Sequence, residues 1–374
     1  MSTSATIWKH DLEATLNACI GDYRDLSPED VTVLPRPPTA LEALRMVHSN
    51  HPCVIKGFSP FLDAAKAYDW SRAETYQAIE GSREVTIAVT DNGLADSVRT
   101  FSDGTTTFVK PFETKMTIAE LIEKLGNKNS TEAFYLQSQD GNVYRNPPRP
   151  SGPPDLSPFQ DYIKAEVEWM EEAVGKAAEA VNLWIGDRKS KTSLHHDPYE
   201  NIYHVLAGSK TFTLLSPLET LHLDQRFHSS STLHPSGDLE NLGLEPQLDP
   251  EPSCRVPWVS SPFIPHRCKS MTIKLEQGDT LYLPAGWWHL VEQDEHTGTV
   301  ENENENKNEN GKEGTGIVVA LNYWYPSELH SQLYAYERLY RRIARLAGRS
   351  GVIPPAEDDL NDESDNDSKC QRRS

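Results

Sequence analysis

The sequence predicts a mainly β protein with flanking helices, built around a jelly roll. Between residues 181 and 325, short apolar segments alternate with turns that contain Gly and Pro, a pattern typical of a sandwich or jelly roll. Helical periodicity dominates the start of the chain and returns after this region. With 374 residues, the chain is long enough to bury a substantial core.

Residues 1–130 are expected to supply helices and strands that flank the jelly roll. Apolar spacing and turn signals predict two helices, two strands and a third helix, at 12–20, 40–47, 51–58, 85–90 and 116–126. The strand at 85–90 precedes Asp-Asn-Gly, which is a strong tight-turn signal. Thr117 and Glu120 have the spacing of a capping box, which predicts where the third helix begins.

The β core is predicted within residues 131–325. Its strands are expected at 133–139, 181–185, 203–206, 211–215, 270–275, 280–283 and 317–324. The proline-rich stretch 146–158 is expected to be a surface connection. Residues 296–316, which contain the low-complexity run ENENENKNENGKE, are interpreted as a long loop between the last two strands.

The end of the chain divides into a helix and a polar tail. Residues 326–350 have one apolar stripe among several arginines, which predicts a helix that packs on its own domain, with a dimer contact as the alternative. Residues 351–374 are rich in acidic residues and are expected to be a disordered tail.

Composition excludes several classes of partner. Lys and Arg total 36 and Asp and Glu total 56, so the formal charge of −20 argues against nucleic acid as the main partner. No uncharged apolar run reaches the length of a membrane span, so no membrane is expected. The five cysteines are scattered without a C-x-x-C pair, so we expect free thiols and a cytoplasmic location, with the nucleus as a further one.

The candidate metal ligands lie in two distant segments. In TSLHHDPYEN an extended backbone would direct His195 and Asp197 to one side and His196 to the other. One imidazole and one carboxylate are two of the three ligands of a facial ferrous site, and His289 in LPAGWWH is the candidate third. Taken alone, His289 is better explained as a hydrogen-bonded core histidine, but the 94-residue spacing suits ligands on distant strands of one jelly roll. Other histidines lie in polar sequence and are expected to face solvent, namely His222, His228, His234, His266 and His296.

These segments resemble the JmjC-domain oxygenases, a cupin-like family. The matching motifs are TSLHHD, G-S-K-x-F at 208–212, LPAGWWH and LNYWY at 321–325. Over roughly residues 35–345, the chain is similar to the small JmjC-only lysyl hydroxylases that act on developmentally regulated GTP-binding proteins. That likeness includes HPCVIKGF, REVTIAVTDNGLADSV, AVNLWIGD and VPW.

The resemblance implies a double-stranded β-helix that holds Fe(II) on His195, Asp197 and His289. It also implies 2-oxoglutarate as cosubstrate and dioxygen as oxidant. The residues matching the family's 2-oxoglutarate positions are Lys210, Thr192, Tyr135, Asn201 and Asn322. A dianion in an apolar barrel needs a charge partner and hydroxyl donors to replace its hydration, and these residue types can supply them.

The function implied by the resemblance is lysyl hydroxylation of a translation-associated GTP-binding protein, by a monomer or a homodimer. The alternatives are N-methyl-lysine demethylation of histones, a non-catalytic JmjC-like scaffold, and a cupin that binds metal without 2-oxoglutarate. Family demethylases more often have Glu where Asp197 stands, and they usually carry zinc-bound reader modules. This sequence has neither feature, which argues against demethylation. The intact ligand set and Lys210 argue against the scaffold, and Lys210 argues against the simple cupin.

Overall fold

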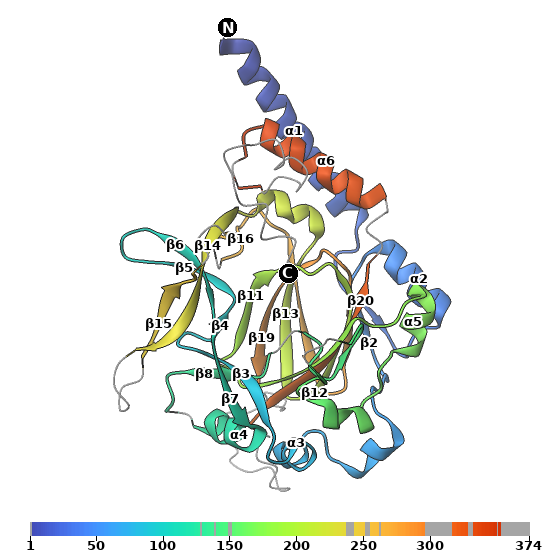
Figure 1. Ribbon diagram of the computed structural model, residues 1–374. Coiled ribbons are helices and arrows are strands. Elements are labelled where there is room, and N and C mark those ends of the chain that lie inside the picture. The colour runs from blue at the N-terminus through green and yellow to red at the C-terminus, as the bar shows by residue number, and fades with distance from the viewer. Residues whose placement is uncertain are drawn as a thin grey trace, which may run out of the picture.

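The computed structural model confirms the predicted fold class, with strands forming the centre and helices around it (Figure 1). It describes residues 2–127, 129–137, 140–148, 152–236, 243–250, 255–261, 263–295, 316–327, 332–349 and 351–352. The predicted loop at 296–316 therefore lies outside the described residues, except for Gly316. The same holds for the predicted tail beyond Val352.

Eight strands form a double-stranded β-helix. Four belong to the large sheet: β10 (Ala180–Gly186), β12 (Tyr199–Ala207), β18 (Thr280–Leu283) and β20 (Val318–Pro326). The other four belong to the small sheet: β11 (Lys191–His195), β13 (Ser209–Leu215), β17 (Ser270–Glu276) and β19 (Trp288–Asp294). The orders β18-β12-β20-β10 and β17-β13-β19-β11 interleave strands from both ends of the domain. Residues far apart in the sequence therefore share one face.

The large sheet is buried on both faces. Along β10, Val181, Leu183 and Ile185 join the core outside the barrel, whereas Trp184 joins the core inside it. The same alternation holds in β20, where Leu321 packs outward and Ala320 inward. Successive side chains of a strand point to opposite faces, so a sheet covered on both sides is read in the sequence as a continuous apolar run.

The N-terminal part extends and covers the large sheet. β1 (Thr32–Leu34) and β2 (Cys53–Ile55) continue it beyond β18, and β9 (Tyr144–Arg145) ends its other edge. A separate three-stranded sheet, outside the barrel, has the order β7-β3-β8. Its strands are Phe112–Thr117, Glu84–Thr90 and Ala133–Tyr135 in that order. The covering helices are α2 (Ala40–Ser49), η1 (Asp63–Ala67), α3 (Ala73–Glu80), α4 (Ile118–Gly126), η2 (Ser157–Asp161) and α5 (Glu168–Val174).

A further sheet beside the barrel was not predicted. Its strands are β5 (Ser97–Thr100), β6 (Thr106–Lys110), β14 (Gln225–Ser236), β15 (Gly243–Leu248) and β16 (Arg255–Val259). The preceding strand β4 (Leu94–Ala95) instead joins β11 at the edge of the small sheet. Polar side chains gave this region the composition of a loop. The expectation that His222 and His228 face solvent is wrong, because both are buried; His222 ends η3 (Pro217–His222) and His228 lies in β14.

The two terminal helices lie against each other at one end of the molecule (Figure 1). They are α1 (Ser2–Leu26) and α6 (Gln332–Leu346). The predicted start of the last helix at 326 is wrong, because Pro326 is the final residue of β20. Val352 was assigned to the tail but is buried beside Leu16 and Ile20 of α1. None of the helices in the described ranges is long and apolar enough to cross a membrane.

Gly208 makes the turn between β12 and β13, with a φ of +69°. A Cβ atom there would lie 2.9 Å from the Asp294 carbonyl oxygen and 3.3 Å from that of Ile317. The left-handed conformation and this close approach both require glycine. The turn therefore touches the end of β19 and the residue just before β20.

The capping box predicted from sequence is present at the start of α4. Thr117 Oγ1 accepts a hydrogen bond from the Glu120 backbone N–H at 3.2 Å, and the Thr117 N–H donates to Glu120 Oε2 at 2.8 Å. We expect Thr117→Ala to lower the free energy of unfolding by about 1 kcal/mol in urea denaturation. Thr117→Ser keeps the hydroxyl and should retain most of that stability. Equal losses in both variants would contradict a role for the cap.

Candidate metal centre

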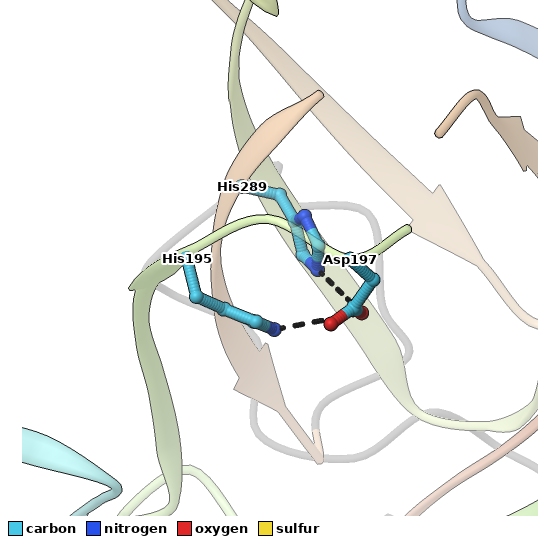
Figure 2. A group of neighbouring side chains, drawn as sticks. All are labelled: His195, Asp197 and His289. Carbon is cyan, nitrogen blue, oxygen red and sulfur yellow. Dashed lines mark ion pairs between the residues drawn. The ribbon is translucent and has the colours of Figure 1, made fainter. Parts of the chain in front are cut away.

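His195, Asp197 and His289 point toward one common space, as Figure 2 shows. His195 ends β11, Asp197 lies in the loop that follows, and His289 is the second residue of β19. Each histidine Nε2 is 3.8 Å from Asp197 Oδ2, and the three potential ligand atoms all lie within 4.8 Å of one another. Two imidazoles and one carboxylate in this arrangement match a facial triad that leaves positions open.

Backbone carbonyls fix the orientation of both imidazoles. His195 Nδ1 is 2.8 Å from the Ser193 carbonyl oxygen, and His289 Nδ1 is 3.0 Å from that of Trp287. An Nδ1–H that donates to a carbonyl leaves the Nε2 lone pair free for a metal. Burial lowers the pKa of His289 to about 3, so its imidazole is neutral, as a ligand must be.

The loop around Asp197 is tied to the segment that carries His289. The Gly286 backbone N–H donates to the Asp197 carbonyl oxygen at 2.9 Å, which connects the two predicted ligand segments directly. His196 does not join the triad, and its ring instead packs edge-on against Trp288 at 4.4 Å. This is the division between alternate side chains that the extended sequence pattern predicted.

Pairing within the small sheet puts the two triad histidines and Thr192 on one face. His195 pairs with His289, and Thr192 pairs with Val291. His289 and Val291 are two residues apart, so they share a face, and partners directly opposite each other do so too. In a regular strand Thr192 and His195 would face opposite ways, but the register shift between them turns both inward.

Lys210 lies further along the same inner face and is 1% exposed. It pairs with Gln293 of β19, four residues beyond His289. Its Nζ donates to Tyr135 Oη at 3.0 Å and to Gln293 Oε1. Burial lowers the pKa of Lys210 to about 7 and raises that of Tyr135. In the part of the chain that the structure describes, no carboxylate forms an ion pair with Lys210, so a buried cation lacks an anion.

The asparagines lie on the inner face of the large sheet. Asn322 Nδ2 donates to Asn201 Oδ1 at 3.2 Å, and Asn322 Oδ1 accepts from Trp184 Nε1 at 2.9 Å. Asn182, the residue opposite Asn322 in β10, donates to the same oxygen at 3.3 Å. Asn322 therefore joins three strands, and Asn201 is the amide with spare hydrogen-bonding capacity.

Sequence analysis missed Gln293 and Gly186 beside Lys210. Gln293 is held by a 2.6 Å hydrogen bond from its Nε2 to the Asp187 carbonyl oxygen. A Cβ atom on Gly186 would lie 2.7 Å from the Tyr135 ring and 2.8 Å from Gln293 Nε2, so only glycine fits. The available signal was strand periodicity, because His289, Val291 and Gln293 alternate along β19.

The donor set fits Fe(II) and 2-oxoglutarate. His195, Asp197 and His289 would hold the metal through two nitrogens and an oxygen. Lys210 and Tyr135 lie on the same barrel interior and would meet the remote carboxylate of the cosubstrate, with Thr192 in the row between. A buried ammonium group without a carboxylate partner favours binding of a dianionic ligand, whereas a role in packing alone would not require a charged side chain.

Comparison with known proteins identifies the family. A family model described as a cupin-like domain matches residues 38–331. The chain is 33% identical over 317 residues to JmjC domain-containing protein E of Dictyostelium discoideum, covering 77% of this chain and 82% of that protein. It is 29% identical over 355 residues to the human bifunctional peptidase and (3S)-lysyl hydroxylase JMJD7, covering 90% and 99%. It is 28% identical to the lysine-specific demethylase JMJ32 of Arabidopsis thaliana, covering 96% of each chain.

With this fold and this constellation of side chains, the chain belongs to the cupin-like JmjC family. Members of that family are 2-oxoglutarate-dependent oxygenases, and this protein is an enzyme of that class.

Removing a triad residue should abolish metal binding. We expect His195→Ala, Asp197→Ala and His289→Ala to weaken Mn(II) binding by more than about 100-fold, measured by electron paramagnetic resonance. His196→Ala is the matched control, because this neighbouring histidine packs on Trp288. Loss of binding in the control, or its retention in the triad variants, would overturn the assignment.

Binding of 2-oxoglutarate should depend on the protonation of Lys210. Its pKa of about 7 in the free protein means that the ammonium form is complete well below pH 7 and is lost as pH rises. The dianion favours the ammonium, so binding at about pH 8 should take up a proton, which calorimetry in buffers of different ionisation heat would measure. Lys210→Met should remove the uptake and weaken binding by about 10- to 100-fold. An unchanged proton balance would exclude Lys210 from the site.

Proposed function

We propose that this enzyme hydroxylates a lysyl side chain of a protein substrate, with Fe(II) bound by His195, Asp197 and His289. The observation that carries the proposal is one barrel face with a metal triad at one end and the buried Lys210 ammonium further along. A metal centre alone would suit many cupins. A buried cation aligned with it suits a cosubstrate that chelates at one end and is anionic at the other.

When bound, Fe(II) and 2-oxoglutarate supply oxygen insertion: dioxygen is reduced, the cosubstrate becomes succinate and carbon dioxide, and a C–H bond becomes C–OH. The chain's own residues position the reactants. Lys210 and Tyr135 anchor the distal carboxylate, Thr192 adds a hydroxyl, and Asn201 offers an amide near the metal. The apolar interior formed by residues such as Phe212 and Val291 excludes water.

For the substrate we propose a GTP-binding protein of the translation machinery, encountered in the cytoplasm and also in the nucleus. The proposal is supported by the subfamily motifs and by the likeness to a human protein named a (3S)-lysyl hydroxylase. The formal charge of −20 would favour a basic peptide region, although salt screens this long-range attraction.

Demethylation of N-methyl-lysine is the competing activity, and the likeness to a plant protein named a lysine-specific demethylase supports it. Both reactions begin with oxidation of a C–H bond beside the same metal. They differ in whether the hydroxylated carbon stays in the product or leaves as formaldehyde.

The test is turnover of lysyl peptides by the purified protein with Fe(II), ascorbate and 2-oxoglutarate. We expect a mass gain of one oxygen on a lysine, with succinate formed in equal amount. The same peptides carrying methylated lysine provide the second arm, with formaldehyde measured. His195→Ala should abolish turnover, and His196→Ala should retain it. Formaldehyde release without any mass gain of oxygen would replace hydroxylation by demethylation.

A further inference from the structure

Asp96 adopts an uncommon backbone conformation beside the metal centre. It lies between β4 and β5 with a φ of +52°, in the left-handed region that non-glycine residues seldom occupy. The preceding residues Leu94 and Ala95 pair in parallel with Lys191 and Thr192 of β11. Asp96 therefore sits next to the part of β11 that leads to His195. Such strain persists only where the surrounding structure imposes it.

Ser193 connects Asp96 to an aromatic side chain. Ser193 Oγ donates to the Asp96 carbonyl oxygen at 2.6 Å and accepts from Trp258 Nε1 at 3.3 Å. The Ser193 carbonyl in turn accepts from His195 Nδ1. One serine thus fixes three neighbours of the metal centre: the Asp96 backbone, the Trp258 indole and the His195 ring.

Trp258 forms a wall next to His195. The two rings are nearly parallel, with an interplanar angle of 6° and centroids 6.0 Å apart. Phe108 of β6 supports the indole from another side, with ring centroids 4.9 Å apart. Trp258 is half-buried, so the residue is partly accessible from outside the protein. An indole held in this way suits the aliphatic stem of a long side chain.

The Asp96 carboxylate has no ionic partner of its own. Within the described ranges, no group donates a hydrogen bond to it or lies within ion-pair distance. His195, Lys110 and Glu113 are the titratable groups whose charges act on it. Lys110 is occupied by Asp249 at 3.0 Å, and Glu113 is a second acid. Burial is the main influence on this carboxylate and raises its pKa to about 6, and no basic side chain in the described ranges is paired with it.

We propose that Asp96 and Trp258 form the subsite for the substrate's cationic side chain, with the indole along its stem and the carboxylate on a primary ammonium group. This inference rests on the proposed function and names the chemistry that selects its substrate. An ammonium can donate to the carboxylate, whereas a trimethylated nitrogen cannot, so the subsite favours unmodified lysine.

The experiment measures binding without turnover. The protein is loaded with Mn(II), and proton line broadening by the paramagnetic ion reports probes near the metal. The probes are Nα-acetyl-lysine N-methylamide and its norleucine, trimethyl-lysine and arginine analogues. We expect the lysine probe to be broadened about tenfold more strongly than the other three, as one charge-assisted hydrogen bond requires.

Asp96→Asn preserves the shape and tolerates the left-handed backbone, and it should reduce broadening of the lysine probe to the norleucine level. Glu113→Gln is the matched control, because it removes one nearby charge from an exposed side chain, and it should retain lysine selectivity. Trp258→Leu should weaken the lysine and norleucine probes together.

Equal broadening of lysine and norleucine, selectivity that survives in Asp96→Asn, or a preference for arginine would overturn the inference. Failure of the proposed function is seen separately. If the lysine probe binds through Asp96 but no lysyl peptide gains oxygen, the subsite stands and the reaction assignment falls. If peptides are hydroxylated while Asp96→Asn binds normally, the reverse holds. A protein that binds no Mn(II) would overturn both.

Discussion

β19 is hydrogen-bonded to β11 on one side and to β13 on the other, and this register determines what faces the barrel interior. His289 lies opposite His195, and Gln293 lies opposite Lys210. A slip of one residue would turn β19 inside out, because the side-chain period of a strand is two. His195 would then lose His289 as its neighbour, and Lys210 would lose Gln293 at the same time.

The second constraint is electrostatic. Lys210 is a cation in a dry interior, and its neighbours Tyr135 and Gln293 are neutral. Burial therefore weakens its hold on its proton. A dianionic cosubstrate reverses that effect, since it supplies the missing charge partner. The folded protein should therefore be more stable with the cosubstrate bound than without it, because the unpaired Lys210 charge destabilises the empty barrel.

Much of this was predictable from the sequence, for reasons that differ between elements. Strong periodicity and turn signals predicted six of the eight barrel strands, and a capping box predicted the start of α4. β11 and β19, which carry the metal-ligating histidines, were not among the predicted strands. The sheet made by β14, β15 and β16 was missed because its polar side chains resemble a loop. Its central strand β14 pairs with β6 across more than a hundred residues of sequence, which no local pattern encodes.

The candidate site divides in the same way. The sequence predicted His195 and Asp197 by alternation and His289 as the candidate third ligand, and family spacing suggested Lys210. The structure brings the three ligands together and places Lys210 further along the same interior. Gln293 and Gly186 were not predicted, because their roles depend on close approach across strands. Asp96 was not predicted for a similar reason, since the left-handed backbone conformation of an aspartate has no sequence signature.

Gly208 lies beside both residues that flank the low-complexity segment after β19, and this position affects how far the sequence of that segment can change during evolution. The glycine contacts Asp294 and Ile317, so both chain ends that lead to that segment are anchored against one turn. Asp294, the end on β19, lies about 17 Å along that strand from His289. Changes of sequence between residues 296 and 315 can therefore accumulate while selection continues to act on the catalytic face.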